Sequence, residues 1–84
     1  MFENLLFRYL SETNQISILR SKGRMLRTHF INGRKRYLYM LKNLYVEVTF
    51  HNDNSELPPE QVRTFDNADA IDRYLRKQGN VSFQ

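Results

Sequence analysis

Few side chains in this sequence have the chemistry of catalysis or metal binding. The chain has two histidines, His29 and His51, and no cysteine, which excludes a thiolate nucleophile, a disulfide and a cysteine-ligated zinc. Its serines lie outside any nucleophile-elbow motif, and its three glycines are too scattered for a phosphate-cradling loop. We therefore expect neither a cofactor nor a metal, and charge and surface are the remaining clues to function.

The basic residues are concentrated in one part of the chain. Residues 13–46 carry eight positive charges and no acid, whereas residues 47–84 carry seven acids and four bases. Such a segment indicates an anionic partner, for example RNA, DNA or an acidic protein surface. It is also compatible with a fold in which the acidic C-terminal third neutralises it. The eight residues are Arg20, Lys22, Arg24, Arg27, Arg34, Lys35, Arg36 and Lys42.

Length and composition indicate one small globular domain. The chain has 84 residues, 40% hydrophobic and 26% charged, which is enough for one modest core. We expect a single domain over 1–84 with a loose tail at 80–84. No apolar run approaches the roughly 20 residues of a membrane-spanning helix, and Glu3 and Arg8 interrupt any secretory signal. With cysteine absent, this favours a cytoplasmic protein that does not contact membranes.

The middle of the chain predicts a three-stranded antiparallel meander over 24–31, 34–41 and 44–51. Asn32-Gly33 is a strong hairpin signal, and a second two-residue turn at 42–43 gives a consistent register. Together the two turns place Tyr37 opposite Thr28 and Val48, Tyr39 opposite Leu26 and Val46, and His29 opposite Arg36. Both turns place the same residues on one face, which a one-residue slip would disrupt. That apolar face is expected to carry Leu26, Thr28, Phe30, Tyr37, Tyr39, Leu41, Leu44, Val46, Val48 and Phe50.

Helical patterns flank the meander. Apolar spacing from Phe2 to Leu10 and again at Ile16 and Leu19 fits either two short helices or one bent helix, with Gly23 as a left-handed stop. A final helix is expected to begin at a cap on Asp66 and to end at Gly79.

Both ends of the chain must then cover the apolar sheet face. The prediction is an α+β fold with two layers: the three-stranded antiparallel meander packed against the N- and C-terminal helices. Residues 62–65 add a possible fourth edge strand.

The opposite sheet face is the candidate binding surface. The register places Arg27 opposite Leu38, which lies opposite Glu47, and it separates the two histidines by about 10 Å, too far to share an ion. Arginine, tyrosine and methionine are typical of protein interfaces, and an open basic face can also bind RNA or DNA. A third possibility is a hydrated face on which Glu47 neutralises an arginine. The candidate residues are Arg27, His29, Arg34, Arg36, Met40, Tyr45 and Glu47.

One enzymatic alternative uses the same face. Metal-independent ribonucleases stabilise a cyclising phosphate with arginine, histidine and tyrosine, and Arg27, His29, Arg36 and Tyr45 supply those types. The order of helices, three strands and helix resembles the RelE-type endoribonuclease toxins. This chain lacks that family's opening strand and late basic strand, so the family's catalytic residues have no counterparts here by position.

A second resemblance covers about the middle third of the chain. The stretch 33–40, GRKRYLYM, followed by LYVEV at 44–48, resembles a group of small bacterial proteins of unassigned function. This resemblance implies a bacterial cytosolic origin and no particular activity.

The leading hypothesis is a small, basic, non-catalytic interaction module. It would use the mixed sheet face for self-association, as a homodimer, or for a protein partner. The alternatives are an RNA- or DNA-binding protein that uses residues 13–46, and a metal-independent endoribonuclease.

Overall fold

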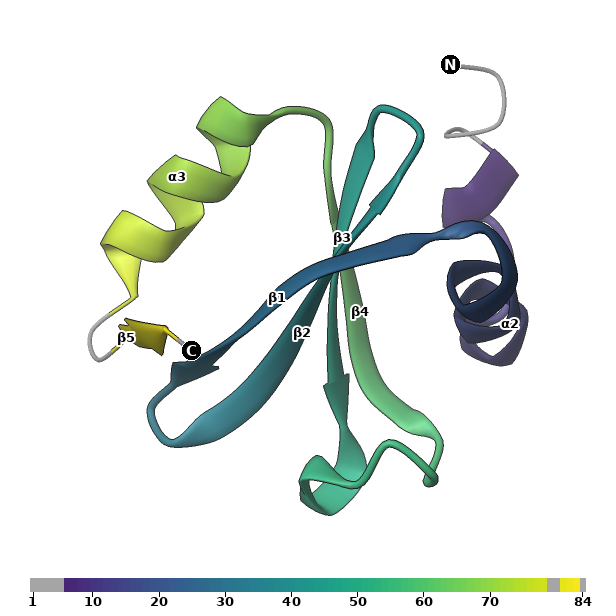
Figure 1. Ribbon diagram of the computed structural model, residues 1–84, viewed down its shortest axis with the longest axis horizontal. Helices are drawn as coiled ribbons and strands as arrows, with labels where there is room; N and C mark the ends of the chain where they lie inside the picture. The colour runs from purple at the N-terminus through teal and green to yellow at the C-terminus, as the bar shows by residue number, and fades with distance from the viewer. Residues whose placement is uncertain (1–5, 79–80, 84) are drawn as a thin grey trace.

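The computed structural model describes residues 6–78 and 81–83 and contains the predicted meander (Figure 1). Its three strands are β1 (Arg24–Ile31), β2 (Arg34–Leu41) and β3 (Leu44–Phe50). Two-residue turns join them in antiparallel order. The central prediction of the sequence analysis is therefore confirmed.

Two further strands extend the meander into a five-stranded sheet of order β4-β3-β2-β1-β5. The predicted edge strand is confirmed as β4 (Pro59–Phe65), which pairs with β3. β5 (Val81–Phe83) pairs with residues 29–31 of β1. The prediction of a loose tail was wrong for this segment, because three residues of it join the sheet.

The register agrees with the sequence along most of its length. Tyr37 lies opposite Thr28 on one side and opposite Val48 on the other, as predicted. In the first turn, Asn32 and Gly33 adopt φ angles of 52° and 81°. These left-handed values explain the Asn-Gly pair, because these two residue types tolerate that conformation best.

A bulge near the start of β1 alters the predicted pairing. Met25, instead of Leu26, lies opposite Tyr39, and the regular register resumes at Arg27 opposite Leu38. An extra residue in one strand turns its side chain toward the other face. Leu26 was predicted on the apolar face with Tyr39, but it lines a hollow on the opposite face beside Leu38.

The two helices cover opposite faces of the sheet (Figure 1). α2 (Glu12–Lys22) packs on one face around Val46 and Val48. α3 (Ala68–Lys77) packs on the other face, where Ile71 contacts the cluster around Leu38 and Phe65. The α+β fold with helices packed on a sheet is confirmed. The helices do not share one face as expected, because the second face carries its own apolar residues.

The N-terminal helical pattern consists of two segments. Residues 6–8 are helical, the chain then turns, and Ser11 caps α2 by accepting a hydrogen bond from the Asn14 amide. Phe7 is buried in the first core, whereas Leu6 and Tyr9, which belong to the predicted stripe, are exposed. Phe2 and Leu5 lie outside the described residues. No helix in the described ranges is long and apolar enough to cross a membrane.

Caps at the helix ends differ from those predicted. Asn67, not Asp66, caps α3 by accepting from the Ala70 amide at 2.9 Å, while Asp66 forms an ion pair with Arg8. α3 ends at Lys77, and the predicted stop at Gly79 lies outside the described residues. Between β3 and β4, residues His51–Asp53 form a single 3-10 turn, η1.

Gly23 ends α2 for a different reason from the predicted one. Its φ is −81°, an ordinary extended value, and its N–H donates to the Leu19 carbonyl at 2.9 Å. A Cβ atom at this position would lie 2.7 Å from that same oxygen. Glycine is required here by the close approach of the helix backbone, not by a left-handed conformation.

We predict that Gly23→Ala lowers the free energy of unfolding by about 1–3 kcal/mol, because the methyl group forces the chain away from α2. Urea denaturation followed by circular dichroism measures this. Ser21→Ala, an exposed change in the same turn, should alter stability by less than about 0.5 kcal/mol. An unchanged midpoint for Gly23→Ala would contradict the proposed contact.

Candidate functional site

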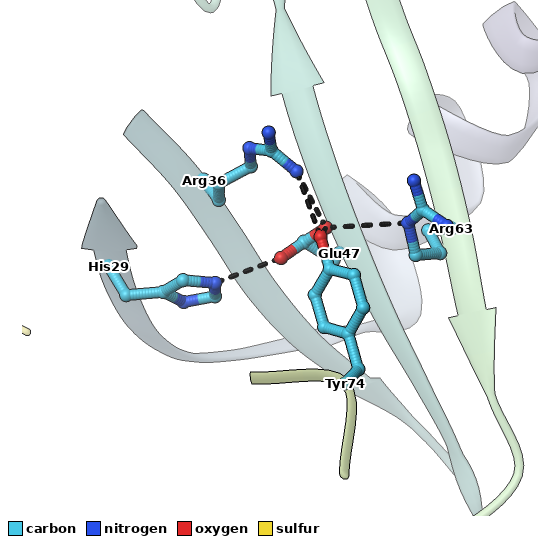
Figure 2. Close-up of polar contacts among 5 residues, drawn as sticks. All are labelled: His29, Arg36, Glu47, Arg63 and Tyr74. Carbon is cyan, nitrogen blue, oxygen red and sulfur yellow. Dashed lines mark hydrogen bonds and ion pairs between the residues drawn. The ribbon is translucent and has the colours of Figure 1, made fainter. Parts of the chain in front are cut away.

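The most unusual feature of the molecule is an ionisable cluster centred on Glu47 of β3, beneath α3 (Figure 2). Glu47 is only 2% exposed, and its Oε2 atom lies 2.9 Å from Nε2 of His29, which is 1% exposed. A carboxylate only accepts hydrogen bonds, so Nε2 of His29 is the protonated ring nitrogen.

The second carboxylate oxygen of Glu47 gathers three further side chains. Oε1 accepts from the Tyr74 hydroxyl at 3.0 Å and from Nη1 of Arg36 at 3.2 Å, and that guanidinium also donates to the Tyr74 oxygen at 3.0 Å. Nε of Arg63 is 3.9 Å from Oε1, and its guanidinium lies 5.0 Å from the centre of the Tyr74 ring. The cluster thus joins β1, β2, β3, β4 and α3.

Strand alternation brings the charged members together. Glu47 lies opposite Leu38 on one side and opposite Arg63 on the other, while His29 lies opposite Arg36. Cross-strand partners share a face, so all four charged or polar side chains lie on the face that α3 covers. α3 then adds Tyr74, whose hydroxyl points at the Glu47 carboxylate (Figure 2).

Electrostatics favour the ionised form of Glu47. Burial by itself raises the pKa of this carboxyl, but hydrogen bonds from His29 and Tyr74 and the charge of Arg36 outweigh it, so the pKa is lowered. The pKa of Tyr74 is raised, first by burial and then by the neighbouring Glu47 carboxylate. Tyr74 therefore stays protonated and continues to donate.

The histidine–carboxylate pair is shielded from solvent. Such a pair can act as an acid–base couple, but His29 and Glu47 are 1% and 2% exposed in this structure. The ribonuclease alternative requires His29 to reach a phosphate, which this arrangement of the chain does not allow. The arrangement instead holds α3 on the sheet.

Arg34 is committed to a second structural role. Its guanidinium donates to Asp53 at 2.9 Å, to Glu60 at 2.8 Å and to the Phe50 carbonyl at 3.0 Å. The pKa values of Asp53 and Glu60 are lowered, chiefly by these hydrogen bonds. Arg34 thereby fixes the connection between β3 and β4, where Asn52 and Asp53 both have positive φ.

The predicted binding face is therefore divided. His29, Arg36 and Glu47 are joined in the buried cluster, and Arg34 binds the β3–β4 connection. The remaining candidates lie nearer the solvent: Arg27 is exposed, and Met40 and Tyr45 are half-buried.

Sequence reasoning missed two members of the cluster. Arg63 and Tyr74 were not among the candidates, because the fourth strand was predicted only as a short edge and the last helix was assigned to the other face. The signal available was Glu47 itself, since a lone acid in the middle of an apolar strand needs partners when it is buried.

A hollow with exposed apolar residues borders the cluster. It has a volume of about 420 Å³ between β1 and α3, and we call it the β1–α3 hollow. Leu26 lines it and is 37% exposed. Met25, which is 51% exposed, does not line it and pairs with Tyr39. The remaining lining residues are Arg27, Leu38, Tyr45, Ala68, Ile71, Asp72 and Leu75.

Carboxylates pair with part of the basic segment. Arg34 and Arg36 are bonded to acidic side chains, which agrees with the interpretation that the acidic C-terminal third neutralises this segment. Lys22 and Arg24 are exposed at the junction of α2 and β1, and Arg27 is exposed on β1.

Comparison of the chain with protein-family models, with curated proteins and with solved structures found no match. Among the residues that the structure describes, no group of three or more histidine, cysteine or acidic side chains could hold a metal ion.

We predict that Glu47→Gln destabilises the fold at neutral pH by about 3 kcal/mol, because Arg36 loses its buried counter-charge. The folded-state pKa of Glu47 is lowered, so its contribution is present above the unfolded pKa and is lost as pH falls through the folded value. The difference between wild type and variant should therefore shrink below about pH 4. Urea denaturation across that range measures it.

Glu56→Gln provides the matched control, because Glu56 is exposed in the β3–β4 connection. It should change stability by less than about 0.5 kcal/mol at both ends of the pH range. If Glu47→Gln lowers the free energy of unfolding by the same amount in acid, the loss of stability comes from altered hydrogen-bond geometry and not from the lost charge.

Proposed function

We propose that this chain is a non-catalytic protein-interaction module that binds its partner at the rim of the β1–α3 hollow. The observation that carries the proposal is the exposure of Leu26, at 37%, on the wall of a concave surface whose lining is largely apolar. Exposed apolar residues clustered at a hollow are typical of interaction sites.

The residue types around the hollow support this assignment. Arg27 and Tyr45, which line it, belong to the classes enriched at protein interfaces. The buried cluster supports the assignment indirectly, because α3 and β1 form a rigid frame for the hollow when Glu47 fixes both to β3.

A photo-cross-linking experiment tests this surface. We expect a benzoylphenylalanine side chain in place of Leu26, which lines the hollow, to give a discrete protein adduct in cells that naturally express the chain. The same cross-linker in place of Gln61, an exposed residue on the distant edge strand β4, should not give that adduct. The cross-linked protein is then purified and its affinity for the intact chain measured.

Leu26→Asp should abolish this binding, because it places a charge in the apolar hollow. Leu57→Asp is the matched control, since Leu57 is equally exposed, at 37%, but lies in the β3–β4 connection. Equal loss in both variants, or no adduct from position 26, would refute the proposal. An adduct between two copies of the chain would identify the homodimer expected from the sequence.

Nucleic-acid binding is the second candidate function. The observation that favours it is the pair of exposed cations Lys22 and Arg24 at the junction of α2 and β1. Phosphate contacts need no deep pocket, so an exposed basic junction is sufficient for them.

We predict for this candidate that random-sequence RNA binds at low salt and that its affinity falls steeply between about 50 and 200 mM salt. Fluorescence anisotropy measures this, with Lys22→Glu combined with Arg24→Glu as the weakened variant and Lys77→Glu as the control. Absence of binding at low salt would remove nucleic acid from consideration.

A further inference from the structure

Another hollow opens on the face of the sheet that α2 covers. It has a volume of about 340 Å³ between residues 6–10, the C-terminal half of α2 and the turn from β2 to β3, and we call it the α2 groove. We infer that the α2 groove binds a single-chain anionic amphiphile, a medium-length hydrocarbon chain that ends in a carboxylate. Five of the described residues that line the groove are apolar: Leu6, Phe7, Leu10, Ile18 and Leu41.

The groove has a buried floor and an exposed wall. Phe7 is buried in the core beneath α2, and half-buried Leu10, Ile18 and Leu41 pack against that core. Leu6 is 51% exposed, so one wall of the groove faces solvent. A hydrocarbon chain in the groove would cover this wall and remove apolar surface from water on both sides.

The size of the groove matches one short chain. At roughly 30 Å³ for each water-sized volume, 340 Å³ holds about eleven non-hydrogen atoms. Small-molecule sites have volumes of about 300–1,000 Å³ and a mainly apolar lining with few polar groups. A helix docked in a groove inserts about four side chains, which is more than this volume holds.

The polar residues of the lining determine the charge of the ligand. Both are lysines, Lys22 and Lys42, and no acid is among the described residues that line the groove. Lys42 already takes part in another interaction of the chain, so the carboxylate is assigned to Lys22.

Lys22 is well placed to bind a head group at the mouth of the groove. It is the last residue of α2 and its side chain is exposed. A lysine can lay its methylene groups along an apolar wall and keep its ammonium group in water. A carboxylate at the mouth would be attracted by this charge, and a quaternary ammonium group would be repelled.

The test uses the uniformly ¹⁵N-labelled full chain and soluble amphiphiles below their micellar concentrations, observed by NMR. We expect decanoate to shift the amide signals of residues 6–10, 18–22 and 41–43 until they saturate. Decyltrimethylammonium, which has the same tail and the opposite charge, should bind about fivefold more weakly. Acetate, which has the charge without the tail, should leave the signals unchanged.

The length of the chain provides a second readout. Each CH₂ group that is fully removed from water improves affinity by about fourfold. Binding should therefore tighten from hexanoate through octanoate to decanoate. It should gain little from dodecanoate to tetradecanoate, because the groove is then full.

Two pairs of variants separate the head group from the tail. Lys22→Gln should weaken decanoate by about threefold and strengthen decyltrimethylammonium, while Lys77→Gln, the same change at the last residue of α3, should do neither. Leu6→Asp should abolish decanoate binding, because it places a carboxylate on the apolar wall. Leu57→Asp, at an exposed leucine outside the groove, should leave binding unchanged. The dispersion of the amide signals verifies that each variant is folded.

Several results would overturn the inference. These are equal binding of decyltrimethylammonium, an affinity that does not depend on chain length, shifts confined to other residues, or equal loss in Leu6→Asp and Leu57→Asp. Shifts that appear only above the micellar concentration would also overturn it, since they would indicate adsorption to a membrane-like surface. The cross-link from position 26 is read on the other face of the sheet, so failure of this site leaves the proposed function intact.

Discussion

The ionised carboxylate of Glu47 is the interaction around which this small fold is organised. A buried charge is expensive unless it is paired and hydrogen-bonded, and Glu47 obtains its partners from β1, β2, β4 and α3 at once. Each element therefore has to occupy one position for the carboxylate to be satisfied. Apolar packing alone would allow α3 more freedom, because its contact with the sheet depends on few residues, among them Ile71 and Leu75.

This constraint separates what the sequence could predict from what it could not. The meander followed from local information, since the turn residues and the two-residue alternation both determine the register. Tyr37 is the clearest example, because two independent hairpins assign its neighbours correctly. The pairings of Glu47 with Leu38 and of His29 with Arg36 followed from the same logic.

Features that depend on three-dimensional proximity were not accessible in this way. No turn residue in the sequence indicates the bulge between Met25 and Arg27. Leu26 was therefore predicted on the wrong face of the sheet. The face chosen by α3 depends on whether Tyr74 reaches Glu47, a contact between residues 27 positions apart. Gly23 was correctly predicted as the end of a helix. The reason is its close approach to the Leu19 carbonyl, which helix propensities do not describe. The sheet face that carries His29 was predicted to be open and basic, because the burial of His29 was not predicted.

The order of strands in the sheet also has a consequence for how the chain folds. β1 to β4 are neighbours in sequence and in space, so each pairing closes a short loop, and such pairings form quickly. β5 differs, because Val81 must find Ile31 on the far side of β1, and the entropy lost in closing that long loop is larger. We expect the terminal strand to dock late, after the hairpins have formed. A nascent chain would then pair β1 to β4 with one another first and add β5 to the outer edge of β1 afterwards.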